Sequence, residues 1–181
     1  MTPAEARAVL DVAELVCSAE ESALAVRRVA AEITARLAQA NPLVLAVMGG
    51  AVVFAGQLLP QLAFPMDFDY LHVSRYGDLT QGGRLDWIVE PRAPVAGRTV
   101  LVLDDILDEG VTLAAIVERL RAQGAAEVLA AVFAEKMLGR DKPAAADVVG
   151  VQLPNRYVFG FGMDVRGAWR NLPAVYALKD G

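Results

Sequence analysis

The chain has 181 residues, 55% of them hydrophobic, which predicts one globular domain over residues 1–181 with a core of its own. Its formal net charge is −5 and no run of Lys or Arg exceeds two residues, so we do not expect a nucleic-acid partner. Cys17 is the only cysteine, which excludes an internal disulfide. The first residues do not form a signal peptide and no apolar run is long enough to cross a bilayer, so we expect a soluble cytoplasmic protein.

Two capping boxes stand near the amino terminus. Thr2–Glu5 has Pro at the first helical position, and Ser18–Glu21 repeats the same spacing of a hydroxyl residue and a glutamate. These boxes predict helices over about 3–16 and about 19–39, the second of which ends at Asn41-Pro42.

Strand and helix patterns then alternate along the chain. Leu43–Val47 is predicted to be a buried strand, and Gly49-Gly50 a tight turn into a helix near 51–62. Further strands are predicted near 66–74, 87–90, 128–134, 148–152, 157–160 and 174–178, and another from Val100 up to the acidic pair Asp104-Asp105, with a helix over 113–123. The polar, glycine-rich segment 75–86 is predicted to be a mobile flap. The alternation favours an α/β fold with a mostly parallel central sheet flanked by helices.

Two adjacent carboxylates, Asp104 and Asp105, follow an aliphatic run that is typical of a strand buried on both faces. The carboxyl ends of such strands are where open α/β sheets bind ligands. Adjacent carboxylates repel each other unless Mg²⁺ offsets their charge or sugar hydroxyls hydrogen-bond them, and a helix cap with a solvated neighbour is the alternative. A phosphate cradle is predicted just beyond, formed by the backbone amides of Glu109, Gly110, Val111 and Thr112.

This order of a hydrophobic strand, an acidic pair, a variable loop, Gly-x-Thr and a helix resembles the phosphoribosyl-pyrophosphate (PRPP) signature of the type I phosphoribosyltransferases. The resemblance covers roughly residues 43–178 and implies that family's fold, with a small hood and a mobile flap over the central sheet. The N-terminal helices, about 3–39, would contribute to the hood or pack against it. PRPP and Mg²⁺ are the ligands that the resemblance implies.

By this resemblance, two residues indicate which purine base the protein would use. Family members acting on 6-oxopurines have Asp at the position of Asp108, where it can serve as the general base for the N7 proton while N9 attacks the sugar. A cap for the following helix is the alternative. Lys136 stands eleven residues before Asp147, as does the family lysine that hydrogen-bonds O6 of the base and so rejects adenine. An ordinary solvated lysine is the alternative reading.

The segment 155–164, NRYVFGFGMD, resembles a second family motif of an aromatic residue, Val-x-Gly and Asp. By this resemblance Tyr157 would stack on the purine, and Val158 would meet its edge through backbone groups. Asp164 would provide a further Mg²⁺ site, and Arg170 would bind pyrophosphate. An aromatic edge strand with a surface Asp and Arg is the alternative.

Gly49 and Gly50 correspond to the family loop whose strained peptide and amides hold pyrophosphate. Met48 stands where family members often have Lys, so we expect no side-chain charge from this loop. Tyr76 lines up with the flap residue that closes over the site.

Together these resemblances imply transfer of the phosphoribosyl group from PRPP to N9 of hypoxanthine or guanine, which is a reaction of purine salvage. A xanthine-preferring enzyme and a non-catalytic regulator that senses PRPP or nucleotides are the alternatives. Family precedent implies a homodimer or homotetramer.

Overall fold

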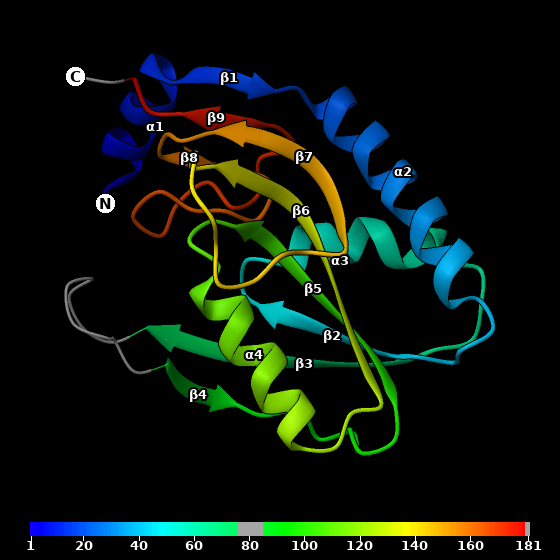
Figure 1. Cartoon of the computed structure of the whole chain (residues 1–181). Coiled ribbons are helices and arrows are strands. Elements are labelled where there is room, and N and C mark those ends of the chain that lie inside the picture. The colour runs from blue at the N-terminus through cyan, green and yellow to red at the C-terminus, as the bar shows by residue number, and fades with distance from the viewer. Residues whose placement is uncertain (76–84, 180–181) are drawn as a thin grey trace.

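A six-stranded sheet forms the centre of the computed structural model, which describes residues 1–75 and 85–179 (Figure 1). The strand order is β4-β3-β2-β5-β6-β7, and every neighbouring pair is parallel except the edge pair of β3 and β4. The bounds are β2 Leu43–Met48, β3 Asp67–Arg75, β4 Leu85–Val89, β5 Thr99–Leu107, β6 Glu127–Met137 and β7 Val148–Pro154. The predicted α/β class and mostly parallel sheet are therefore confirmed, whereas most of the predicted flap, Tyr76 included, lies outside the described residues.

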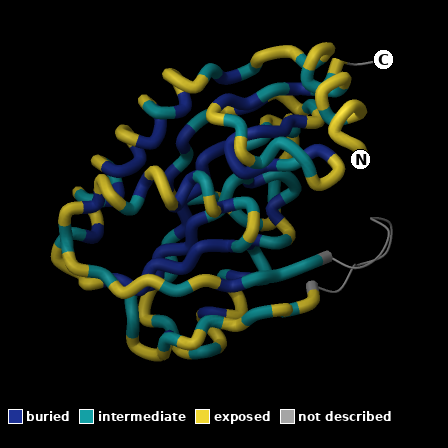
Figure 2. The backbone as a smooth tube through the Cα atoms, turned by 180° about the vertical axis from the view of Figure 1, so that it is seen from behind, coloured by how far each residue is buried: buried dark blue, intermediate teal, exposed yellow. Residues whose placement is uncertain are grey.

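Helices cover both faces of this sheet. α2 (Ala19–Leu37) and α3 (Val52–Leu58), which continues as the 3-10 turn Leu59–Gln61, pack on one face. α4 (Val111–Ala122) packs on the other face (Figure 1). Side chains of β5 alternate between the two cores: Leu101 and Leu103 face α2 and α3, while Val100 and Val102 face α4. This explains the continuous aliphatic run, since a strand covered on both sides has no polar face, and Figure 2 shows the buried centre that results.

The amino-terminal helix is shorter than predicted. Its capping box is present, with the Thr2 hydroxyl accepting from the Glu5 amide, but α1 ends at Val12 (Pro3–Val12). The residues that follow form β1 (Glu14–Cys17), so the predicted helix over 3–16 is wrong in its last turn. β1 pairs with the distant β9 (Val175–Ala177), and this long-range pairing overrides a helical pattern that buries no residue of α1.

β1 and β9 belong to a second, three-stranded sheet of order β1-β9-β8, in which β8 is Val158–Phe159 and both pairs are antiparallel. The segments predicted as strands near 157–160 and 174–178 therefore lie outside the central sheet. Phe161, just after β8, stacks on Phe133 of β6 with ring centroids 3.8 Å apart. This aromatic contact fixes the small sheet against the central one.

Candidate active site

The acidic pair lies at the end of β5, inside the strand rather than after it. β5 continues to Leu107, so Asp104 and Asp105 are among its last residues and neither caps a helix. α4 begins at Val111, and its N-cap is Gly110 with φ +81°, without any side-chain cap. Asp108 consequently does not cap α4, which removes the alternative reading of that residue. A cavity of about 270 Å³ lies here, lined by Asp104, Asp105, Ile106, Leu107, Asp108, Gly110, Thr112, Leu113 and Val132.

Asp105 is held in an enclosed position. Its carboxylate lies so close to Gly50 that a Cβ on that glycine would be 2.0 Å from Oδ2. Burial raises the pKa of the Asp105 carboxyl above its ordinary value, while hydrogen bonding with Asp104 and Ile106 and the charge of Arg170 act in the opposite direction. The Asp105 amide donates to Asp104 Oδ1 and the Ile106 amide to Asp105 Oδ1, both at 2.9 Å. The two carboxylates are thus oriented by the backbone of their own strand.

The Gly49-Gly50 turn lies beside this carboxylate. The peptide bond between Met48 and Gly49 is cis. The Gly50 carbonyl lies so close to Gly162 that a Cβ on Gly162 would be 2.1 Å from the oxygen, which explains the glycine at position 162 as the Asp105 contact explains the one at position 50. Met48 is partly buried against the core, so this turn offers amides and no side-chain charge.

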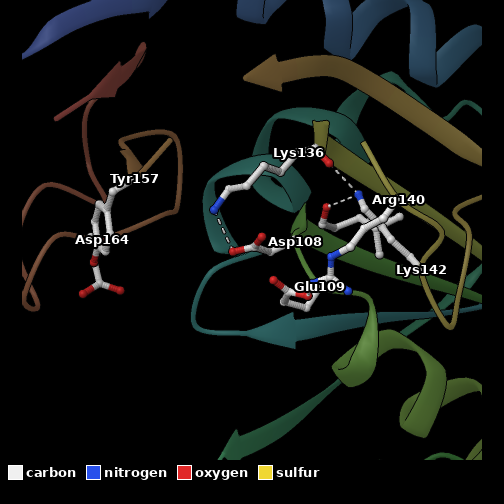
Figure 3. A network of polar contacts seen from close by, with 8 residues as sticks. Asp108, Glu109, Lys136, Arg140, Lys142, Tyr157 and Asp164 are labelled. Carbon is white, nitrogen blue, oxygen red and sulfur yellow. Dashed lines mark hydrogen bonds and ion pairs between the residues drawn. The ribbon is translucent and has the colours of Figure 1, made fainter. Parts of the chain in front are cut away.

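Asp108 and Lys136 meet although 28 residues separate them. Lys136 Nζ is 2.7 Å from Asp108 Oδ2, and the two side chains are 13% and 43% exposed (Figure 3). β5 and β6 are adjacent parallel strands, so their carboxyl ends bring the two side chains to one edge. Lys136 lies inside β6, which ends at Met137, and its low exposure excludes the reading of an ordinary solvated lysine.

A second cavity, of about 230 Å³, joins this pair to the loop after β8. Its lining consists of Asp105, Ile106, Asp108, Lys136, Tyr157, Val158, Met163, Asp164 and Arg170. Figure 3 shows Tyr157 and Asp164 across from the Lys136–Asp108 pair. Asp105 and Asp108 line both cavities, so the phosphate loop and the aromatic motif share one site.

Asp164 and Arg170 form an ion pair at 2.5 Å rather than standing separately on the surface. Arg170 also donates to the Gly162 carbonyl at 2.6 Å, and Asp164 accepts from the Gly167 amide at 2.6 Å. The Tyr157 hydroxyl donates to the Asp164 carbonyl at 3.2 Å, which leaves the ring half exposed at the cavity. Within residues 1–75 and 85–179, no three His, Cys, Asp or Glu side chains are grouped so as to hold a metal by themselves.

Three residues at this site were missed by the sequence reasoning. Arg140 pairs with Glu109 of the phosphate cradle, and Lys142 bonds to backbone carbonyls at the ends of β5 and β6. Trp169 donates its indole N–H to the Ala6 carbonyl of α1 at 2.8 Å, between Asp164 and Arg170 in the chain. For Arg140 and Lys142 the signal in the sequence was the basic character of segment 136–142, and the loop itself has no periodic pattern. The partner of Trp169, Ala6, is more than 160 residues away in the chain.

Known proteins resemble this chain over most of its length. Residues 16–166 match the phosphoribosyl transferase domain family. The hypoxanthine-guanine phosphoribosyltransferase of Bacillus subtilis strain 168 is 32% identical over 170 residues, 93% of this chain and 94% of that protein. The solved structure of a hypoxanthine-guanine-xanthine phosphoribosyltransferase gives a TM-score of 0.84 at 30% identity, covering 94% of this chain and 99% of that one. The bifunctional protein TilS/HprT of Listeria innocua is 35% identical over 170 residues, and this chain spans 26% of its length.

The fold and the site define a type I phosphoribosyltransferase, as the acidic strand end and phosphate loop had indicated. Within that family the chain belongs to the hypoxanthine-guanine phosphoribosyltransferases. Helices long and apolar enough to cross a membrane are absent from residues 1–75 and 85–179.

Proposed function

We propose that this chain transfers the 5-phosphoribosyl group of PRPP to N9 of hypoxanthine or guanine, giving IMP or GMP and pyrophosphate. The observation that carries the proposal is the Lys136–Asp108 pair, 2.7 Å apart, in a cavity that also holds Tyr157 and adjoins the phosphate cradle. A cationic donor beside a carboxylate complements a 6-oxopurine, whose O6 accepts a hydrogen bond and whose N7 or N9 gives up a proton.

The base would lie in the 230 Å³ cavity. Lys136 would donate to O6, which leaves adenine without an acceptor for this donor. Tyr157 would stack on the ring, and backbone groups of Val158 would meet its edge. Asp108, released from Lys136 when the base binds, would act as the general base.

PRPP would lie along the end of β5. The amides from Glu109 to Thr112 would hold its 5′-phosphate at the start of α4. Asp104 and Asp105 would bind the ribose hydroxyls, and the leaving pyrophosphate would meet Arg170 and the amides of Gly49 and Gly50. Arg170 and the glycine amides would stabilise the negative charge that leaves with the pyrophosphate. The carboxylates would lie beside the positive charge that develops on the ribose.

The donor set fits Mg²⁺ because it offers carboxylate oxygens and room for substrate oxygens. Asp105 and Asp164 line one cavity, and Asp104 lies next to Asp105 on β5. A pair of protein carboxylates completed by phosphate oxygens and water is the usual arrangement for Mg²⁺. Asp104 and Asp105 would hold one ion and Asp164 a second one, each together with substrate oxygens and water, and bound Mg²⁺ would supply positive charge for the pyrophosphate.

Mixing PRPP, Mg²⁺ and hypoxanthine with the protein tests the reaction, and IMP is the expected product. Asp108→Asn should lose most of kcat, by about 10²–10⁴-fold, because the amide cannot accept the proton. PRPP should still bind to this variant, as measured by titration calorimetry. An unchanged kcat in Asp108→Asn would rule out the general-base role.

Preference among the bases is a second question. The likeness to a solved hypoxanthine-guanine-xanthine enzyme keeps a xanthine-preferring reaction as the alternative. Comparing kcat/KM for hypoxanthine, guanine and xanthine in the same assay separates the two. A non-catalytic regulator is the other alternative, and it requires PRPP binding without any IMP formation.

A homodimer or homotetramer is the proposed assembly. Phe68 and Tyr70, alternate residues of β3, are 50% and 39% exposed, and Ile88 of β4 is 58% exposed. Alternate residues share one face of a strand, so an apolar area lies open at this edge of the sheet. We also expect the protein to act in the cytoplasm, where a buried free thiol such as Cys17 stays reduced.

A further inference from the structure

A buried lysine, Lys142, joins the ends of β5 and β6. Its Nζ donates to the carbonyl of Lys136 at 2.7 Å (Figure 3). It also donates to the carbonyl of Leu107 at 3.0 Å and lies 3.1 Å from Glu135 Oε1. The side chain is 8% exposed. An ammonium group has three donors, and each of them has a partner here.

These two carbonyls border the base-binding pair. Strand pairing between β5 and β6 ends at Leu107 and Glu135, so no ladder hydrogen bond between these strands fixes the residues beyond. The Leu107 carbonyl belongs to the peptide that leads into Asp108, and the other carbonyl belongs to Lys136 itself. Lys142 therefore bridges the two strands at the end of their pairing, next to Asp108 and Lys136, while Lys136 itself stays paired with Leu153 of β7.

The same segment touches the phosphate loop. A Cβ on Gly110 would lie 3.1 Å from Lys142 Cβ and 3.3 Å from the Ala144 carbonyl oxygen. Arg140 pairs with Glu109. The backbone after β6 is thus packed against the cradle, while the Lys142 head group reaches the strand ends.

We propose that Lys142 is a positioning residue that sets the separation of Asp108 and Lys136 and so supports 6-oxopurine selection and turnover. The inference rests on the proposed function, because it assigns a role to Lys142 through those two residues. Removing the ammonium would leave two carbonyls without their donor, and they would rotate toward water and take the attached side chains with them. Misplacing a reacting group by about 1 Å can cost about 100-fold in rate.

Lys142→Met keeps the aliphatic stem and removes only the donors. We expect kcat/KM for hypoxanthine to fall by about 10–100-fold. The ratio of kcat/KM for hypoxanthine to kcat/KM for adenine should also fall. KM for PRPP should stay within about 3-fold, because the stem still packs on Gly110. Lys179→Met is the matched control, since this lysine is exposed near the end of the chain, and it should behave as the wild type.

Two further variants separate positioning from general stability. Glu135→Gln removes the ion pair but leaves both carbonyl bonds, so base preference should be kept. In a Lys136→Met background, Lys142→Met should cause little further loss of base preference, because Lys142 acts on that preference through Lys136. If Lys142→Met does not fold, Lys142→Arg takes its place: a longer head group should raise KM for the base while leaving KM for PRPP.

The outcomes distinguish this inference from the proposed function. A wild-type protein that makes no IMP overturns the proposed function, and with it the role of Lys142. If the wild-type protein is active and the Lys142 variants have the same KM for the base and the same base preference as the wild type, only the positioning role is overturned. Equal losses for PRPP and base, or full additivity with Lys136→Met, overturn it as well, since they indicate a structural contribution only.

Discussion

Four carboxylates gather near the end of β5, and their charges are compensated in different ways. Asp108 pairs with Lys136 and Glu109 with Arg140. Asp105 accepts from a backbone amide of its own strand and has Arg170 near enough to act on its pKa. A substrate rich in phosphate would therefore meet a strand end whose acidic charge is already partly offset.

Asp105→Asn should stabilise the protein at neutral pH. Burial raises the pKa of this carboxyl, so the folded state binds its proton more tightly than the unfolded state does. The free energy of unfolding therefore falls as the pH rises above about 4, the ordinary pKa of an aspartate. In metal-free buffer at pH 7.5 we expect Tm to rise by about 2–4 °C, the shift for about 1 kcal/mol in a chain of this size. Thermal unfolding followed from pH 3 to pH 8 would measure the effect.

The gain in Tm should vanish below about pH 4, where the carboxyl is protonated in both states. Asp141→Asn, at an exposed position, is the control and should leave Tm unchanged. A constant difference at every pH would show that the charge of Asp105 is not the cause.

Arg140→Met should weaken PRPP binding by exposing the charge of Glu109 to the 5′-phosphate. The two side chains are 63% and 37% exposed, so the pair itself adds little stability. We expect KM for PRPP to rise by about 5-fold, equivalent to about 1 kcal/mol. Steady-state kinetics with PRPP as the varied substrate would measure it.

The double variant Glu109→Gln, Arg140→Met should recover a KM close to that of the wild type, since it removes both charges. A double variant as impaired as Arg140→Met alone would instead mean that Arg140 contacts the substrate itself.

At the scale of elements, α1 orients the loop that carries Asp164 and Arg170. The helix buries no residue, yet its Ala6 carbonyl accepts the indole N–H of Trp169 at 2.8 Å. Trp169 has φ +71°, so the loop turns sharply just before Arg170. α1 therefore contributes to the site through one hydrogen bond to this turn.

Trp169→Phe should keep an aromatic ring at this position and lose the hydrogen bond to the Ala6 carbonyl. We expect a loss of about 1 kcal/mol in the free energy of unfolding. KM for PRPP should rise more than KM for the base, because Arg170 and Asp164 would serve the pyrophosphate. Urea unfolding and steady-state kinetics measure the two effects, and Trp87→Phe, on β4 against Arg119, is the control. Equal changes in both KM values would contradict the loop's role.

Local patterns predicted some elements better than others, for a physical reason. The strand before Asp104 was correctly identified because burial on both faces demands an aliphatic run. The helix beyond Val12 was not, because Leu15 to Cys17 gain their hydrogen bonds from β9. No local pattern encodes a partner some 160 residues away.

At the scale of the whole molecule, the exposed apolar residues of β3 and β4 predict association. Tyr70→Lys should shift the protein toward monomer, because a charge in an apolar interface loses its hydration. Light scattering after gel filtration measures the mass. Leu24→Lys, at a position 51% exposed on α2, is the control and should leave the mass unchanged. A wild-type monomer, or an unchanged assembly in Tyr70→Lys, would contradict the prediction.

The sequence by itself determined the class of fold and the chemistry available at one strand end. Periodicity and turn residues act over a few positions, so the aliphatic run, the acidic pair and the Gly-x-Thr loop could be identified locally. Only the tertiary structure decided which side chains meet. Lys136 reaches Asp108 because β6 lies beside β5, and Lys142 is buried between their ends because the following loop folds back. Such contacts depend on strand order and loop path, and both are set by the packing of the whole chain.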